Sequence, residues 1–516
     1  MQRRNFLKIA SRSALGLPMV VNGVSVAAIT ASPFLNFNSE SDKVLVLVQL
    51  KGGNDGLNTI IPLDQYSNLM NHRSNVMIPE NKVLKLNNKT GLHPAMTGLQ
   101  ALYNDGRIGI VQGVGYPNQN RSHFRSTDIW TSGSAAEIVE TSGWAGRYFH
   151  SQHASFPEDY PNEENPDPFA LTIGKSVSTT CQGPTANFSL AIKDPFSLSP
   201  LTTPDDGELP EGYYGDQLSF LRTSINQTNK YGDVIRAAGE KGNNLAEYPG
   251  GNKLADQLKT VAQLISGGLN TKVYIVSMGG FDTHSEQVEI DNSTGVHALL
   301  LRNLSDAISA FQDDIQQLGI ADRVLGMTFS EFGRRIKSNG SKGTDHGSAA
   351  PLVLFGNCVN AGILGENPEI PSEVDNKEGV AMQHDFRAIY GTVLQDWLGV
   401  SESDVSQLMY GLFPNLPLLE CSPTTSTYVT DNRMEVSVFP NPFANKANIS
   451  FNTEGEWMRI SVFDAFGKEV RVVADQVFPR GTHQLTTSFK GMPNGNYYYR
   501  VVTNNYNYTK AVVRLK

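Results

Sequence analysis

Acidic and imidazole side chains gather in two short, glycine-flanked segments of this 516-residue chain. Residues 279–284 read Gly-Gly-Phe-Asp-Thr-His, and residues 343–347 read Gly-Thr-Asp-His-Gly. Carboxylate oxygens and neutral imidazole nitrogens are donors that divalent cations take, and glycine lets the backbone turn sharply enough to aim them. The pattern predicts a metal site formed by Asp282, His284, Asp345 and His346. Turn or cap roles for the acids and buried roles for the histidines are the competing interpretations.

Residues 121–125 read Arg-Ser-His-Phe-Arg and supply a candidate nucleophile. A hydroxyl near a metal loses its proton more easily, and an arginine holds an anionic oxygen through two parallel hydrogen bonds. We therefore take Ser122, Arg121 and His123 as candidate catalytic residues. A purely structural turn is the alternative, and the residue types leave both interpretations open.

The elements that must position these side chains follow an alternating pattern. Continuous apolar runs at 44–49, 273–278, 324–329 and 351–355 predict strands of a sheet that is buried on both faces. Apolar residues at helical spacing predict helices within 254–265, 300–318 and 386–397. We expect an α/β fold with a largely parallel sheet. The segment 162–214 is rich in Pro, Asp and Gly and predicts long excursions over the surface.

Polar segments follow three of these strands at their carboxyl ends. Asp55 lies in a Gly-Gly-Asn-Asp-Gly segment after the first strand, Asp282 and His284 follow the second, and Ser330 and Glu331 follow the third. Ligands of open parallel sheets bind at that edge, so the placement favours one shared cleft. Asp55 has two possible roles, as a metal ligand or as part of a turn. The turn is an alternative because Asn and Asp tolerate left-handed backbone. Glu331 and Arg334 are expected to support the site, for example by pairing with each other.

The two ends of the chain have the sequence features of targeting signals. Residues 1–39 carry Arg3 and Arg4 before an uncharged stretch and resemble a twin-arginine export signal, although a membrane anchor is the alternative. A Ser/Thr/Pro-rich linker at 421–433 precedes short alternating strands, which predict a small all-β sandwich domain at 434–516. Its motifs resemble the C-terminal sorting domain of the type IX secretion system. A carbohydrate-binding β-sandwich is the alternative.

Composition excludes some classes of function. The net charge is −9 and no basic run is present, which argues against a nucleic-acid partner. Three scattered cysteines are too few for a disulfide framework.

Seven motifs together resemble the domain-of-unknown-function 1501 family across residues 40–420; they lie at 52–58, 92–95, 113–117, 121–126, 280–284, 331–334 and 343–347. That family is similar to the alkaline phosphatase and sulfatase superfamily, so the resemblance implies an alkaline phosphatase-like α/β/α sandwich with a metal site. Asp345 and His346 resemble the superfamily's Asp-His-Gly metal motif, and Asp282 with His284 resembles its earlier ligand pair. Asp55 matches the position of the first metal-binding acid, and the resemblance implies that His384 is the last histidine ligand.

Departures from the pattern limit what the resemblance implies about function. The Asp-x-His spacing is shorter than in the phosphatases, and the sulfatase Cys/Ser-x-Pro-x-Arg context is missing from the sequence, which disfavours a sulfatase. We expect an exported metal-dependent hydrolase acting on anionic phosphate or related esters. The alternative is a non-catalytic, metal-stabilised cell-surface binding or assembly protein. The donor set suits zinc, manganese or iron, and fewer imidazoles would favour calcium or magnesium. Export would use the twin-arginine and type IX machineries, through the periplasm to the medium or cell surface.

Overall fold

The computed structural model of the chain describes residues 20–21, 24–25, 42–198, 201, 213–420, 436–453, 455–464, 469–503 and 507–515. The chain divides into two compact units, Ser41–Thr424 and one that holds the C-terminal strands, and each is described by itself. Within the predicted signal segment, β1 (Val20–Val21) pairs with β2 (Val24–Ser25). The Arg3-Arg4 pair and the predicted linker lie outside the described residues.

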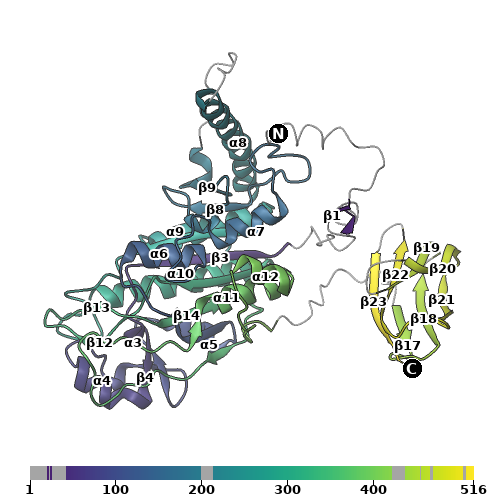
Figure 1. Cartoon of the computed structure of the whole chain (residues 1–516). Coiled ribbons are helices and arrows are strands. Elements are labelled where there is room, and N and C mark those ends of the chain that lie inside the picture. The colour runs from purple at the N-terminus through teal and green to yellow at the C-terminus, as the bar shows by residue number, and fades with distance from the viewer. Residues whose placement is uncertain are drawn as a thin grey trace. The chain divides into compact units, whose positions relative to one another are not determined.

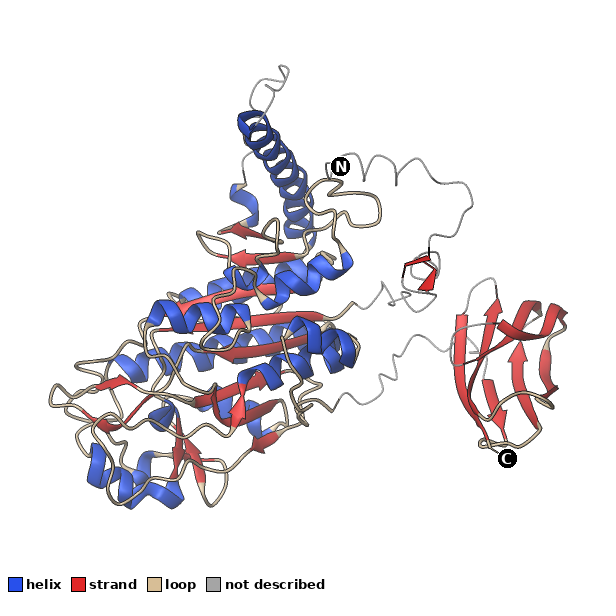
Figure 2. Ribbon diagram, in the orientation of Figure 1, coloured by secondary structure: helices blue, strands red, loops and turns tan. Residues whose placement is uncertain are grey.

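A nine-stranded sheet, counted over the described residues, forms the centre of the larger unit (Figures 1 and 2). Its order is β15-β7-β14-β11-β3-β10-β8-β9, and β16 also pairs with β7. Only β14 runs antiparallel to both of its neighbours. The predicted largely parallel sheet is therefore confirmed. The strands are β3 (Val44–Lys51), β7 (Ile108–Gly115), β8 (Ala170–Ile173), β9 (Ser189–Ile192), β10 (Val273–Gly279), β11 (Val324–Phe329), β14 (Ala350–Phe355), β15 (Gly362–Leu364) and β16 (His384–Asp385).

Both faces of the sheet are covered, because its central strands direct apolar side chains to each face. On β3, Val44, Val46 and Val48 enter one hydrophobic core, and Leu45 and Leu47 enter the other. The first core also contains side chains from α5 (Thr97–Asn104), α8 (Tyr213–Lys241), α9 (Lys253–Ser266) and α10 (Val296–Gln317). The second contains side chains from α6 (His123–Ser132), α7 (Trp144–Gln152), α11 (Phe386–Thr392) and α12 (Glu402–Leu408). These layers give the predicted α/β/α sandwich.

Two expectations need correction. The segment 162–214 is not only a surface excursion, because β8 and β9 within it form one edge of the main sheet. Their short apolar runs lie between Pro- and Asp-rich stretches, which mask the strand signal. The predicted helix at 386–397 becomes α11 followed by a π-helical turn, η7 (Val393–Trp397).

Shorter elements surround the carboxyl edge of the sheet. Strands β12 (Arg334–Ser338) and β13 (Thr344–His346) form an antiparallel pair. The sequence after β3 forms α3 (Gly56–Thr59) and a small sheet of β4 (Ile60–Pro62), β6 (Thr90–Leu92) and β5 (Leu84–Lys85). The remaining helices are η2 (Leu63–Gln65), α4 (Tyr66–Arg73), η3 (Glu80–Lys82), η4 (Thr179–Cys181), η5 (Pro195–Ser197) and η6 (Ala321–Arg323). None of the helices in the described part of the chain has the length and apolar character needed to span a bilayer.

The C-terminal unit is an antiparallel β-sandwich. One sheet has the order β17-β18-β21 and the other β20-β19-β22-β23. Side chains of both sheets, such as Ile449 and Val462, share one buried core. The predicted all-β character is confirmed. The strands are β17 (Val436–Phe439), β18 (Lys446–Thr453), β19 (Glu456–Asp464), β20 (Glu469–Phe478), β21 (Gly481–Ser488), β22 (Gly495–Thr503) and β23 (Asn507–Arg514).

Candidate functional site

The carboxyl ends of β11, β3 and β10 meet at one edge of the sheet. These strands are adjacent and parallel, so the loops that follow them lie side by side. Gly52, after β3, has a φ of +122°, and a Cβ at this position would lie 2.4 Å from the amide nitrogen of Asp282. Its backbone N–H also donates to Glu331 Oε1 over 2.8 Å. Glycine at position 52 thus allows the three loops to pack against one another.

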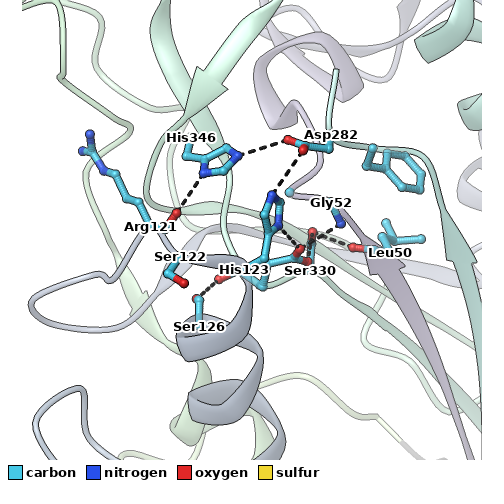
Figure 3. A network of polar contacts seen from close by, with 12 residues as sticks. Leu50, Gly52, Arg121, Ser122, His123, Ser126, Asp282, Ser330 and His346 are labelled. Carbon is cyan, nitrogen blue, oxygen red and sulfur yellow. Dashed lines mark hydrogen bonds and ion pairs between the residues drawn. The ribbon is translucent and has the colours of Figure 1, made fainter. Parts of the chain in front are cut away.

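Three imidazoles converge on the Asp282 carboxylate. His284 Nε2 and His346 Nε2 each lie 3.1 Å from Oδ1, and His123 Nε2 lies 3.3 Å from Oδ2. The Nε2 atoms of His284 and His346 are 2.9 Å apart. Figure 3 shows His346 and His123 reaching Asp282 from β13 and from the start of α6. We call Asp282, His123, His284 and His346 the His–Asp cluster.

Each histidine of the cluster also makes a hydrogen bond through its other ring nitrogen, Nδ1. An oxygen lies 2.8–3.0 Å from every Nδ1 atom. The pairs are His346 with the Arg121 carbonyl, His123 with Glu331 Oε1, and His284 with Asp345 Oδ1. Carbonyl and carboxylate oxygens only accept, so each Nδ1 carries the proton and donates it. In the neutral ring, every Nε2 therefore presents a lone pair to the centre.

The convergence of these lone pairs fits a bound cation. Nitrogen lone pairs and a carboxylate oxygen that face one another at 2.9–3.1 Å repel unless positive charge lies between them. With Zn–N bonds of about 2.05 Å, neighbouring ligand atoms of a tetrahedral zinc lie about 3.3 Å apart. Burial lowers the pKa of His346, which favours its neutral, ligating form. The ligand atoms of His123, Asp282 and His346 all lie within 4.8 Å of one another and therefore fit a divalent cation, and His284 contacts two of these three residues.

Arg334 holds the loops beneath the cluster. It is 1% exposed, and its guanidinium donates to Asp282 Oδ1 over 2.7 Å. It also donates to the carbonyls of Gly52, Gly53, Phe281 and Thr344. Burial raises the pKa of Asp282, but the hydrogen bond from Arg334 and the charge of its guanidinium outweigh burial and lower that pKa to about 2. Asp282 is thus ionised at any physiological pH.

Asp345 lies behind His284. Its Oδ1 accepts from His284 Nδ1 and from Asn339 Nδ2, and its Oδ2 accepts from Arg335 Nη1 over 3.1 Å. Burial raises the pKa of Asp345, yet the hydrogen bonds from His284 and Asn339 lower it overall. In this arrangement the carboxylate orients an imidazole, as outer carboxylates do in many metal sites.

Asp55 and His384 lie in different surroundings. Asp55 is fully buried, where it pairs with Arg73 and accepts from Gln287 Nε2 over 2.6 Å. Burial raises its pKa, but the charge of Arg73 and the hydrogen bond from Gln287 bring it below its ordinary value. His384 belongs to β16, beside Val114 of β7. Neither side chain is among the groups that contact the His–Asp cluster in the described part of the chain.

The candidate catalytic segment lies at the start of α6. Ser122 is the exposed N-cap residue, and its side chain makes no capping hydrogen bond. Arg121 reaches the cluster through its backbone carbonyl, whereas its guanidinium donates to the Lys377 carbonyl over 2.6 Å. Figure 3 shows that guanidinium pointing away from His346 and Asp282.

Glu331 and His123 have partners other than those that the sequence predicts. Glu331 was expected to pair with Arg334, but its carboxylate contacts the His123 ring, and Arg334 contacts Asp282 instead. His123 was expected beside the nucleophile, and the structure puts its Nε2 among the atoms of the cluster. A signal was present, since Glu331 lies two residues after the end of the third strand, and a glutamate is a common acceptor for a ligating histidine.

Two family matches cover separate parts of the chain. Residues 261–396 match the family described as protein of unknown function (DUF1501), and residues 437–514 match the secretion system C-terminal sorting domain. Both resemblances predicted from the motifs are thereby confirmed. The sorting domain indicates secretion or a cell-surface location. No curated protein gives a significant match to the chain.

Several solved structures resemble the chain at low identity. A protein in the alkaline phosphatase superfamily from Vibrio parahaemolyticus has 9% identity and a TM-score of 0.34, covering 92% of this chain and 82% of its own. A sulfatase from Pseudoalteromonas sp. has 11% identity and a TM-score of 0.32, covering 89% and 86%. The phosphonate monoester hydrolase of Silicibacter pomeroyi has 10% identity and a TM-score of 0.30, covering 91% and 89%. At scores this low, the function has to be argued from the residues of this chain.

Proposed function

We propose that the chain is an exported, metal-dependent hydrolase of phosphate or related esters, with its cation on the His–Asp cluster. The observation that carries this proposal is the common orientation of the three histidines. Every Nδ1 has an oxygen acceptor behind it, and every Nε2 faces Asp282. This arrangement is typical of histidines that ligate a metal.

The donor set defines the class of cation. Three imidazoles and one carboxylate suit zinc, manganese or iron better than calcium or magnesium. Asp345 acts in this proposal as the acceptor that orients His284, and Asp55 and His384 are not assigned as ligands. This differs from the ligand set expected from the sequence, which included all three.

The surroundings of the cluster support access by a substrate. Asp282 and His284 side chains are each 45% exposed, so an ester could reach the centre from solvent. When bound, the cation would act as a Lewis acid on an ester oxygen and lower the pKa of a water ligand. The buried Arg334 keeps Asp282 ionised, and Glu331 keeps the Nε2 lone pair of His123 directed inward.

The candidate nucleophiles are a water molecule and the Ser122 hydroxyl. Ser122 directly precedes His123 in the sequence, and its side chain makes no capping hydrogen bond. Replacement of Ser122 by alanine separates the two. Loss of more than about 100-fold in kcat would assign the attack to the hydroxyl, and a change below about 3-fold would assign it to water.

The test of the proposal is metal analysis followed by substrate assays. The purified chain should contain close to one equivalent of a transition metal, measured by mass spectrometry, and should hydrolyse phosphomonoester, phosphodiester or phosphonate ester substrates. His346→Ala should lose the metal and more than about 100-fold of the turnover while remaining folded. The control is His72→Ala, because His72 is a part-exposed histidine whose ring hydrogen-bonds to the Pro371 carbonyl.

Two results would contradict the hydrolase. A chain without metal after growth and dialysis with zinc, manganese and iron would remove the proposed centre. A metal-loaded chain without turnover on any of these esters would leave the non-catalytic, metal-stabilised surface protein as the function. The sorting domain is compatible with both the hydrolase and the non-catalytic surface protein, because it brings the protein to the medium or the cell surface through the secretion machinery.

A further inference from the structure

Gln287 is a buried side chain that contacts both loops of the His–Asp cluster. It is 0% exposed, and its Oε1 accepts from Thr283 Oγ1 over 2.9 Å and from Thr344 Oγ1 over 2.8 Å. Thr283 lies between Asp282 and His284, and Thr344 precedes Asp345. A single amide oxygen therefore bridges the two segments that carry most of the cluster.

The orientation of the Gln287 amide is fixed from its other side. Its Nε2 donates over 2.6 Å to Asp55 Oδ2, and that carboxylate also pairs with Arg73. A carboxylate only accepts, so Nε2 must face Asp55 and Oε1 must face the two threonines. The Asp55 and Arg73 side chains are both 0% exposed, which makes this support rigid.

Backbone hydrogen bonds also join the two loops that Gln287 bridges. The amide of Thr344 donates to the Thr283 carbonyl over 3.0 Å, and the amide of Gln287 donates to the Lys342 carbonyl over 2.9 Å. The two loops are thus already in register through their backbones. The Gln287 side chain adds a further contact, because its oxygen accepts from a side chain next to the ligands in each segment.

We propose that Gln287 is a positioning residue of the metal site. Its amide oxygen fixes the distance between the Asp282–His284 and Asp345–His346 segments. This inference rests on the proposed metal function. It also gives Asp55 a different role from the ligand expected from the sequence, since Asp55 and Arg73 together form the anchor for the Gln287 amide.

The test compares variants that differ only in hydrogen bonding. Thr344→Val keeps the shape of the side chain and removes its hydroxyl, whereas Thr344→Ser keeps the hydroxyl and should preserve the bridge. Gln287→Met removes the amide at similar volume. The control is Gln257→Met, because the part-exposed Gln257 also makes paired amide hydrogen bonds, but with the backbone of Ser277 in β10 and not with a residue of the two site loops.

Zinc affinity, measured on the full chain by competition with a chromophoric chelator, is the main readout, and the urea midpoint of unfolding is the second. We expect Gln287→Met and Thr344→Val to weaken zinc binding about 10-fold or more, with Thr344→Ser within about 2-fold of the natural chain. Gln257→Met should lower the urea midpoint and leave zinc affinity unchanged.

The outcomes separate this inference from the metal proposal itself. If the natural chain binds no metal, the proposed function fails. If it binds zinc and Thr344→Val binds as tightly, or if Gln257→Met weakens binding equally, Gln287 has no positioning role. Should Gln287→Met not fold, the Thr344 pair alone decides the result.

Discussion

Replacement of Arg334 by methionine tests whether one buried guanidinium holds the site loops together. Three of its hydrogen bonds are fully buried: Nε to the Gly53 carbonyl at 2.7 Å, Nη1 to the Thr344 carbonyl at 2.7 Å, and Nη2 to the Phe281 carbonyl at 2.9 Å. Each buried carbonyl left without a donor costs about 1–3 kcal/mol. The variant should therefore lose about 3–9 kcal/mol of unfolding free energy.

Urea unfolding of the full chain, followed by tryptophan fluorescence, measures this loss. Trp130, Trp144 and Trp397 lie in the larger unit and report on it. Arg335→Met is the control, because the neighbouring Arg335 is 25% exposed and pairs with the part-exposed Asp345, so its loss should stay below about 1 kcal/mol. Equal losses in the two variants would refute the reasoning.

A loss near the upper end would exceed the total stability of many domains, which is about 5–15 kcal/mol. Arg334→Lys then provides the measurement, because lysine keeps the charge and loses the planar fork that reaches several carbonyls at once. We expect a lower urea midpoint than in the natural chain. A lysine variant as stable as the natural chain would contradict the role of the fork.

Three further predictions concern the site and its surroundings. Glu331→Gln keeps an oxygen for the Gly52 amide but removes the charge behind His123, so zinc affinity should fall about 10–100-fold in a chelator competition; unchanged affinity would argue against His123 as a ligand. Asp345→Asn should weaken zinc binding by a similar factor without abolishing it, whereas a complete loss, seen by metal analysis, would make Asp345 a direct ligand. Burial lowers the pKa of His297 from 6.5 to about 4, so the folded chain binds fewer protons than the unfolded chain between these values. Its contribution is full above about pH 6.5 and is lost as the pH falls toward 4, at up to about 1.4 kcal/mol per pH unit. His297→Gln should flatten this slope in urea titrations, and an unchanged slope would refute the assignment.

The sequence predicted the elements whose signals are local. Strands β3, β10 and β11 are continuous apolar runs, and their observed bounds agree with the prediction within two residues. Strand β7 was not predicted, because its sequence Ile-Gly-Ile-Val-Gln-Gly-Val-Gly interrupts the apolar run with glycines. Glycine weakens a strand signal when it lies inside the strand.

The site residues also differ in how far the sequence predicts their surroundings. Asp282, His284 and His346 were predicted as neighbours from donor chemistry and from their positions after strands, and the structure brings all three into contact. The surroundings of Asp55 were not predictable, because its partner Arg73 lies on α4 and its partner Gln287 lies 232 residues along the chain. Only tertiary contacts show that this acid faces a guanidinium.

The contacts of Arg334 and Gln287 have a consequence for how an ion would enter. Both residues join the loops through bonds within the protein, so an ion at the proposed site would meet ligands already held in place, and little chain ordering would accompany its capture. Loading would then need no refolding and could take place after export. A chelator would likewise strip the centre while leaving the surrounding fold intact.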